Sequence, residues 1–267
     1  MDNTSKDILV TGAYGGMGSA AVRALTKKGY RVFALDLNAG EPRPQVIPVK
    51  ADITDPESVN QALTAVSGHT KELYAIIHFA GIYMLDSLVE LEFEALQRIF
   101  GVNTLGACYI NKAFMPLLKK GSRVIITTSE LAPLDPLPFT GIYAVTKAAL
   151  DKYAYSLRME LQLLGISVSV LRAGAVKTRM LNVSTDALDR FCENTTLYSC
   201  NAKRFKRIVD RVEARCIPPE KIAAKALKIL GKRSPKFAYA INRNPLLCLL
   251  NILPKRLQLW AIRKVLK

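Results

Sequence analysis

The chain has 267 residues and is 50% hydrophobic, which is enough to bury one substantial core in a single domain. Its formal net charge is +16, and most of this excess lies after Glu220, where twelve Lys and Arg residues and no acidic residue occur. No stacking surface or reading motif accompanies the charge, so nucleic-acid binding is not indicated. Five cysteines without a Cys-x-x-Cys pair, and only two histidines, argue against a disulfide framework, a metal site and a Ser-His-Asp triad. No long apolar run occupies the first thirty residues, so we expect a cytoplasmic protein.

Short apolar runs alternate with helical patterns along most of the chain. The runs predict strands at residues 7–11, 31–35, 45–49, 73–79, 123–127 and 166–171. Helices are predicted at residues 19–28, about 56–65, around Asn103, 143–164 and 218–230. This alternation predicts an α/β fold in which helices cover both faces of a doubly wound parallel sheet, and residues 1–267 form one domain.

Two segments near the C-terminus depart from this alternation. Residues 178–217 have weak periodicity and mix polar with aromatic residues, which is typical of a substrate lid beside a strand end. Residues 245–267 form a basic, apolar arm that is too interrupted to span a bilayer. We favour packing of this arm against the body or a partner subunit, and peripheral contact with an anionic membrane surface is the alternative.

A glycine-rich turn follows the first predicted strand. Gly12, Gly16 and Gly18 let the backbone approach a pyrophosphate closely, and the helix that follows presents free N–H groups to it. Asp36 ends the second strand, where a carboxylate can accept hydrogen bonds from the ribose hydroxyls and would repel a 2′-phosphate. The sequence therefore predicts a dinucleotide site that prefers NAD(H) over NADP(H).

The predicted reaction centre lies between residues 129 and 147. Tyr143 and Lys147 are four positions apart in a helical pattern, so their side chains project from one face of the helix. An ammonium beside a tyrosine stabilises the phenolate, and we expect Lys147 to lower the pKa of Tyr143 and make it a general acid and base. Ser129 follows a strand end and can hold the substrate oxygen.

Taken together, the motifs resemble the short-chain dehydrogenase/reductase family from Ile8 to about Leu230. The matching segments are residues 11–18, Asp52-Ile53, residues 103–106, Ser129, residues 143–147 and residues 174–178. The resemblance implies a Rossmann-type fold, a homodimer or homotetramer, and a water relay through which Asn103 links Lys147 to solvent. It also implies cofactor contacts at Gly12, Tyr14, Gly15, Gly16, Met17, Gly18, Asp36, Asp52, Ile53, Ala80, Gly81, Tyr143, Lys147, Gly174, Val176 and Thr178.

Three features depart from the family pattern. His78-Phe79 stands where the family carries two asparagines, and Ala173 stands where a proline is expected. Gly12, Gly15 and Gly18 also fit the spacing of the longer sugar-nucleotide branch, although chain length favours the shorter one.

We interpret the chain as an NAD(H)-dependent oxidoreductase that interconverts a secondary alcohol and a ketone. Apolar residues between Ser129 and Tyr143 favour a bulky, steroid-like substrate, and Leu137-Pro138-Phe139 resembles hydroxysteroid members of the family. The alternatives are an enzyme acting on small polar or sugar-type alcohols, and a non-catalytic binding protein that senses the cofactor.

Overall fold

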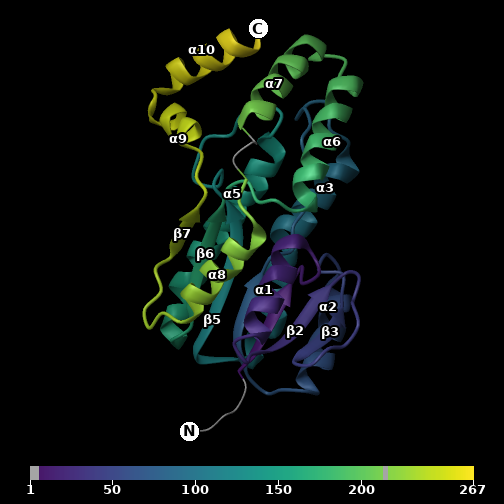
Figure 1. The fold of residues 1–267 in the computed structure, drawn as a ribbon, viewed down its shortest axis with the longest axis vertical. Helices are drawn as coiled ribbons and strands as arrows, with labels where there is room; N and C mark the ends of the chain where they lie inside the picture. The colour runs from purple at the N-terminus through teal and green to yellow at the C-terminus, as the bar shows by residue number, and fades with distance from the viewer. Residues whose placement is uncertain (1–5, 213–215) are drawn as a thin grey trace.

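A parallel sheet of seven strands forms the centre of the described chain (Figure 1). The structure is a computed structural model that describes residues 6–212 and 216–267. The strand order is β3-β2-β1-β4-β5-β6-β7. The strands are β1 (Asp7–Thr11), β2 (Arg31–Asp36), β3 (Val46–Lys50), β4 (Leu73–His78), β5 (Leu118–Ser129), β6 (Ser167–Ala173) and β7 (Ala238–Ile241). The order reverses direction between β1 and β4, which opens a crevice at the carboxyl ends of these strands.

Helices cover both faces of the sheet because successive strand residues point to opposite sides. Ile8 and Val10 of β1 pack towards α1 (Gly16–Thr26) and α8 (Pro219–Leu230), which lie against each other. Leu9 points to the other face, where it shares a core with α2, α4 and α5. The helices on that side are α2 (Pro56–Ser67), α3 (Phe93–Phe100), a π-helical turn (Gly101–Leu105), α4 (Gly106–Phe114) and α5 (Gly141–Leu161). Short 3-10 turns follow α4 (Met115–Leu117) and α5 (Gln162–Leu164).

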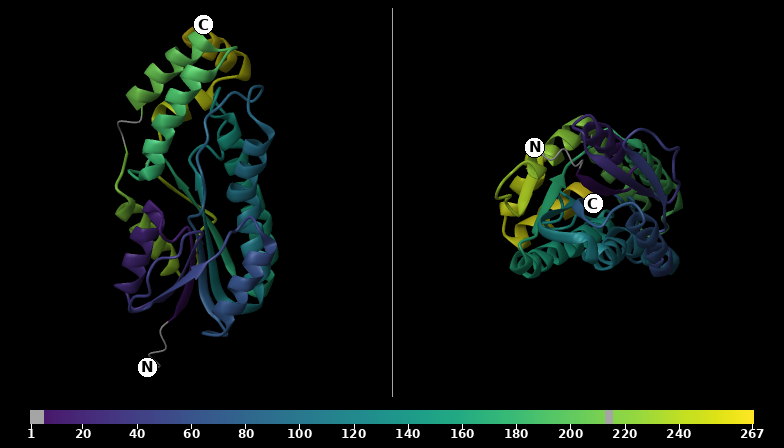
Figure 2. Two further views of the ribbon diagram at one scale, coloured as in Figure 1. Left: turned by 90° about the vertical axis from the view of Figure 1, so that its right-hand side faces the viewer. Right: turned by 90° about the horizontal axis from the view of Figure 1, so that it is seen from below.

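A further group of helices lies at the end of the molecule opposite the N-terminus (Figures 1 and 2). Its members are α6 (Arg179–Asn194), α7 (Ser199–Val212), α9 (Pro245–Ile252) and α10 (Lys255–Leu266). Phe139, Phe191 and Phe205 form the centre of a separate apolar cluster beneath them, and Leu266 of α10 joins it. This cluster connects the segment 178–217 and the C-terminal arm to the body.

The segment 178–217 leaves the body and returns to it at adjacent points. The backbone N–H of Lys177 donates to the Ile217 carbonyl at 2.8 Å, and the Ile217 N–H donates to the Ala175 carbonyl at 3.1 Å. Val176 and Ile217 thus form a parallel bridge at the base of the segment.

The α/β fold class predicted from the sequence is confirmed, and the apolar runs correspond to the six strands β1 to β6. The prediction missed β7, a short strand whose residues are not fully buried. It also missed the helical character of the segment 178–217, where α6 and α7 form. Helix α1 begins at Gly16, three residues before the predicted start, because its first turn contains glycines that sequence patterns do not assign to a helix.

Candidate active site

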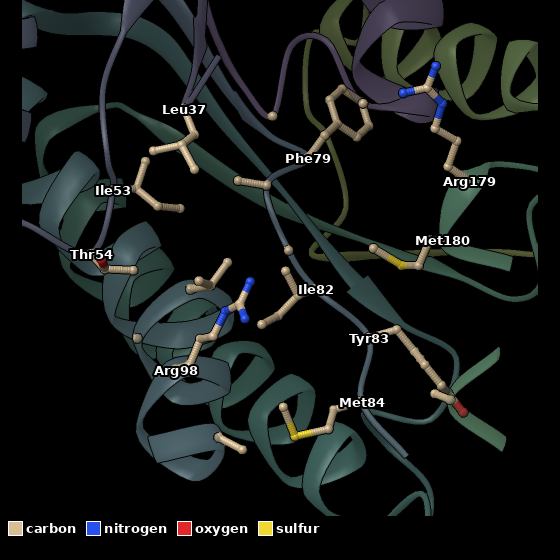
Figure 3. Close-up of a pocket in the computed structure, with 18 of the residues that line it drawn as sticks. Leu37, Ile53, Thr54, Phe79, Ile82, Tyr83, Met84, Arg98, Arg179 and Met180 are labelled. Atoms are coloured by element: carbon tan, nitrogen blue, oxygen red, sulfur yellow. The ribbon is translucent and has the colours of Figure 1, made fainter. Parts of the chain in front are cut away.

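A cavity of about 1870 Å³ lies at the carboxyl ends of β1, β2 and β4 (Figure 3). Residues of the glycine turn line one side, and residues from the ends of β2 and β3 line another. The segment after β4 and the start of α6 complete the wall. The predicted cofactor residues in its lining are Gly12, Tyr14, Gly15, Gly16, Met17, Gly18, Asp36, Asp52, Ile53, Ala80, Gly81 and Thr178.

The glycine turn is a close-packed cradle. Gly12 has φ +65°, and a Cβ atom there would lie 2.6 Å from the backbone nitrogen of Ala80. At Gly16 a Cβ atom would lie 2.5 Å from Cγ2 of Thr178, and at Gly18 it would overlap the Gly12 carbonyl oxygen. Helix α1 has neither a side-chain cap nor an acidic residue in its first turn, so its N-terminal N–H groups are available to an anion. These features fit the pyrophosphate of a dinucleotide.

Asp36 connects the end of β2 to the glycine turn. Its Oδ2 accepts a hydrogen bond from the Tyr14 backbone N–H at 2.9 Å, while Oδ1 is bound to none of the described residues. A carboxylate oxygen therefore stays available at the cavity wall, where ribose hydroxyls could donate to it. Leu37 follows and is exposed, so the next position carries no cation to attract a 2′-phosphate.

Asp52 and Ile53 shape the wall at the end of β3. The Asp52 carboxylate accepts hydrogen bonds from the backbone N–H and the hydroxyl of Thr54, at 2.8 and 2.7 Å. Ile53 packs against Gly106, where a Cβ atom would lie 2.6 Å from the Ile53 Cδ1 atom. This fit explains why the motif around Asn103 ends in glycine.

Ser129, Tyr143 and Lys147 come together beside the cavity. The end of β5 carries Ser129, whose hydroxyl accepts from the Leu131 N–H at 3.2 Å and lies close enough to the Tyr143 phenol, in the first turn of α5, to lower its pKa. Lys147 lies one turn further along α5, is 5% exposed, and has its Nζ 5.8 Å from the centroid of the Tyr143 ring. The Tyr83 ring, which lines the cavity, packs against the Tyr143 ring with centroids 4.9 Å apart.

The pKa values of this pair differ from the sequence-based expectation. Burial raises the pKa of Tyr143 to about 12, and the nearby Ser129 hydroxyl only partly opposes that shift. Burial also lowers the pKa of Lys147 to about 8. We expected the ammonium to lower the pKa of the phenol, and that expectation is wrong for this structure because desolvation dominates at both groups.

Asn103 lies in the π-helical turn, and its side chain is fully engaged. Its Oδ1 accepts from the Ile82 N–H at 2.8 Å, and its Nδ2 donates to the Ile82 carbonyl at 2.9 Å and to the Thr146 hydroxyl at 3.1 Å. A Cβ atom at Gly81 would lie 3.1 Å from Lys147 Nζ and 3.2 Å from Asn103 Oδ1. Asn103 therefore fixes the segment after β4 against α5 beside Lys147, and its part in a water relay stays a prediction.

Not every predicted cofactor residue reaches the cavity. Gly174 packs against the backbone of Asn242, and Val176 pairs with Ile217, so neither lines it. Tyr143 and Lys147 do not line it either, although the Tyr143 ring packs against the Tyr83 ring, which does. Several lining residues were missed by the sequence analysis, among them Glu90, Arg98, Arg179 and Arg190. Figure 3 shows Arg98 extending from α3 and Arg179 from the start of α6. Only the position of Arg179, directly after the Thr178 motif, could have indicated a role.

The departure at His78 is explained by its environment. The ring is 4% exposed, with Nε2 3.0 Å from Asn111 Oδ1 and Nδ1 3.5 Å from the Thr11 hydroxyl. Burial lowers the pKa of His78 to about 4. A neutral histidine thus links β1, β4 and α4 beneath the site, whereas Phe79 lines the cavity itself.

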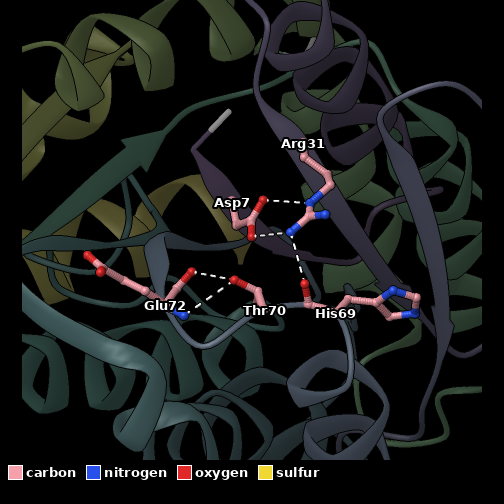
Figure 4. A network of polar contacts seen from close by, with 5 residues as sticks. All are labelled: Asp7, Arg31, His69, Thr70 and Glu72. Carbon is pink, nitrogen blue, oxygen red and sulfur yellow. Dashed lines mark hydrogen bonds and ion pairs between the residues drawn. The ribbon is translucent and has the colours of Figure 1, made fainter. Parts of the chain in front are cut away.

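The second histidine, His69, belongs to a structural network at the amino ends of the strands, away from the cavity (Figure 4). Arg31 donates two hydrogen bonds to the Asp7 carboxylate, at 2.7 and 2.5 Å, and a third to the His69 carbonyl at 3.1 Å. This network joins the starts of β1 and β2. The described residues contain no group of three or more His, Cys, Asp or Glu side chains placed to hold a metal ion.

Comparison with known proteins places the chain in a family. A family model described as short chain dehydrogenase matches residues 6–189. Estradiol 17-beta-dehydrogenase 2 of Mus musculus is 32% identical over 197 residues, which cover 69% of this chain and 51% of that enzyme. The match thus spans about half the length of the mouse enzyme. The uncharacterized oxidoreductase YbbO of Escherichia coli K12 is 29% identical over 249 residues, or 89% of this chain and 86% of YbbO.

Solved structures show the same fold. A short chain dehydrogenase from Burkholderia cenocepacia J2315, in complex with NADP, has a TM-score of 0.73 at 22% identity and covers 100% of both chains. A 3-ketoacyl-(acyl-carrier-protein) reductase from Brucella melitensis, complexed with NADH, has a TM-score of 0.73 at 21% identity and covers 90% of this chain and 98% of its own.

The chain therefore belongs to the short-chain dehydrogenase/reductase family. Its relatives are named as dehydrogenases and reductases, and it is an oxidoreductase of the class that acts on CH–OH groups.

Proposed function

We propose that this protein interconverts a secondary alcohol and a ketone with NAD(H). The observation that carries the proposal is the placement of Ser129 and Tyr143 close together beside the buried Lys147, next to a cavity whose glycine cradle suits a dinucleotide. When bound, the cofactor supplies or accepts the hydride. Ser129 would hold the substrate oxygen, and Tyr143 would donate the proton to a ketone or accept it from an alcohol.

The ionisation of the two side chains suits this proton transfer. Tyr143, with its pKa at about 12, is a neutral phenol at physiological pH and can donate a proton to the oxygen of a ketone. Lys147 has a pKa of about 8, so it changes protonation state near neutral pH and can compensate the charge that develops on Tyr143. Substituting Tyr143 by Phe should abolish turnover while the affinity for NADH, measured by its fluorescence, is retained. Unchanged turnover would favour a non-catalytic, cofactor-sensing protein.

The preference for NAD(H) is proposed from Asp36. The free Oδ1 of Asp36 at the cavity wall would accept from ribose hydroxyls and repel a 2′-phosphate. Fluorescence titration should show NADH binding at least about tenfold tighter than NADPH, a difference of about 1.4 kcal/mol. Asp36→Asn keeps an acceptor for the Tyr14 N–H and should narrow that ratio. Equal affinity of the unchanged protein for both cofactors would contradict the preference.

A bulky apolar substrate is proposed from the cavity beyond the glycine turn. Tyr83, Met84, Leu85, Met180 and Phe191 line this part of it. The 32% identity to a mouse estradiol dehydrogenase supports a steroid-like substrate. NADH formation should be measured with steroids, long-chain alcohols, polyols and sugars. Turnover restricted to polyols or sugars would establish the alternative, a site for small polar alcohols.

A homo-oligomer is proposed from the outer face of α5. Val145, Tyr155 and Met159 are exposed there, as is Leu105 in the π-helical turn before α4. Pairing of this face with a second copy would remove those side chains from water. Light scattering coupled to size exclusion should give at least twice the chain mass, and Met159→Glu should lower it to that of one chain.

A further inference from the structure

The C-terminal arm, α9 and α10, is held firmly on the body. Leu266 and Gln258 are buried, and the Asn201 side chain of α7 donates to the Leu266 carbonyl at 2.7 Å. At the other end of the arm, the Asp135 N–H donates to Asn251 Oδ1 at 3.0 Å, and Lys255 forms an ion pair with Asp135. These contacts fix which side of the arm packs against the body, and the opposite side is its outer face.

That outer face is unusually apolar for a surface. Eight of the nineteen exposed large hydrophobic residues in the described chain occur between positions 246 and 265. They are Leu246, Leu249, Ile252, Leu253, Leu257, Leu259, Trp260 and Val265. Leu246 and Leu249 share one side of α9 by their three-residue spacing, and Leu253 directly follows the end of the helix. In α10, Trp260 lies two residues from the buried Gln258, and 100° per residue places it opposite the buried side.

Cations surround these apolar side chains. Arg256, Arg263, Lys264 and Lys267 of the arm are exposed, and no acidic residue follows Glu220 in the chain. Helix α7, which contacts α10, adds exposed Lys203, Arg207 and Arg211 and a single exposed carboxylate, Asp210. Helices α7, α9 and α10 lie together at one end of the molecule (Figures 1 and 2). This end thus combines exposed leucines and a tryptophan with an excess of positive charge.

We propose that the outer face of the arm binds the surface of an anionic lipid bilayer. Such a surface accepts apolar side chains at the level of the headgroups and pairs the surrounding Lys and Arg with lipid phosphates and carboxylates. A second copy of the chain would instead bring two positively charged faces together, which is unfavourable. The contact is peripheral, because no helix of the described residues is long and apolar enough to cross a membrane.

Binding in this orientation has a consequence for the cavity. The arm and the segment 178–217 share the cluster around Phe139, and Phe191 of that cluster also lines the cavity. The bilayer would therefore lie against the helices that cover the cavity, where an apolar molecule dissolved in the lipid could pass to it. The membrane contact itself does not depend on the proposed function.

The experiment uses the full chain and its own fluorescence, because Trp260 is the single tryptophan. Vesicles of phosphatidylcholine with phosphatidylserine should shift its emission to shorter wavelength and carry the protein in flotation, whereas phosphatidylcholine alone should do neither. Replacing Arg256, Arg263 and Lys264 by Gln should weaken binding about a hundredfold, from about fivefold for each lost charge. Replacing Lys27, Lys28 and Lys71, exposed at the other end of the molecule, is the matched control and should leave binding unchanged.

A second pair of variants tests the apolar contribution. Leu246→Ser with Leu249→Ser should also reduce flotation, and Leu163→Ser, an exposed leucine remote from the arm, should not. Absence of flotation and of an emission shift with anionic vesicles would overturn the proposal. So would an emission shift that depends on protein concentration and occurs without lipid, because this would identify a second copy as the occupant.

Discussion

Glu90 holds the connection between α6 and α7 through Thr195. The Thr195 hydroxyl donates to Glu90 Oε2 at 2.7 Å, and the N–H groups of Thr196 and Leu197 donate to Oε1 at 2.9 and 3.1 Å. Both Glu90 and Thr195 line the large cavity. One carboxylate from the segment before α3 therefore fixes the helices that cover the site.

Replacing Glu90 should loosen this connection. Glu90→Ala should speed hydrogen exchange of the amides of residues 196–198, because two of them lose their acceptor. These hydrogen bonds lower the pKa of Glu90 to about 2. A carboxylate with a lowered pKa stabilises the fold above its ordinary pKa near 4.5, and the contribution disappears as the pH falls from there towards 2. The protection factors of the same amides, which correct for the slower intrinsic exchange at lower pH, should therefore fall in the unchanged protein over this pH range. Glu92→Ala, two residues away, is the control, and equal exchange in both variants would contradict the role.

The buried Lys147 should lower the free energy of unfolding of the protein at pH 7. Its pKa of about 8 lies below the ordinary 10.5, so burying the ammonium costs free energy at pH 7, and this cost declines as the pH rises from about 8 to 10.5. Lys147→Met should raise the free energy of unfolding at pH 7 by on the order of 3 kcal/mol and abolish turnover. Urea denaturation at pH 7 and 10 measures the gain, which should shrink at the higher pH. Lys228→Met, at an exposed position of α8, should show neither effect, and a less stable Lys147→Met protein would refute the argument.

His78 should make the protein sensitive to mild acid. Its pKa is about 4 in the fold and near 6.5 in an unfolded chain, so the unfolded state binds more protons between these values. Unfolding free energy should therefore fall by about 3 kcal/mol as the pH drops from 6.5 to 4. His78→Asn should flatten this dependence in chemical denaturation, with His69→Asn, at an exposed position, as its control. If the unfolding free energy of His78→Asn still falls between pH 6.5 and 4, groups other than His78 cause the acid sensitivity.

Alanine substitutions at Gly15 and Gly16, two neighbouring positions of the glycine turn, should differ in their effects. Gly16→Ala places a Cβ atom 2.5 Å from Thr178 Cγ2, whereas Gly15→Ala meets only the Gly12 carbonyl at 3.3 Å. We expect Gly16→Ala to destabilise the protein by about 1–3 kcal/mol and to weaken NADH binding, with smaller effects for Gly15→Ala. Thermal unfolding and NADH titration should be measured for both variants. Equal stability and equal NADH affinity would show that the Thr178 side chain moves aside at no cost.

The sheet was predictable from the sequence because its central strands are buried on both faces and appear as continuous apolar runs. Leu9, Phe33 and Ile76 are fully buried members of such runs. Strand β7 lies at the edge of the sheet and has only four residues, Ala238–Ile241, and so short an apolar run does not by itself identify a strand. The buried side of α10 is formed by Gln258 and Leu266, and it could be recognised only once α7 was in place.

The candidate site was predictable where its residues fall in one local motif, as with the glycine turn or the four-residue spacing of Tyr143 and Lys147. Tyr83, Glu90 and Arg190 come from segments whose positions depend on distant contacts, so no local pattern marks them. The raised pKa of Tyr143 was not foreseen because desolvation depends on everything packed around the ring. The cofactor contacts and the role of Asn103 stay predictions.

The bridge between Val176 and Ile217 makes the segment between them replaceable as a unit. Because its two ends are paired with each other, its length is independent of the distance between β6 and α8. A segment from another family member, of different length and lining, could therefore be grafted at this point without rerouting the sheet. The residues of the proposed proton transfer, on α5 and at the strand ends, would be unchanged. The new segment would change the part of the cavity lining that selects the substrate.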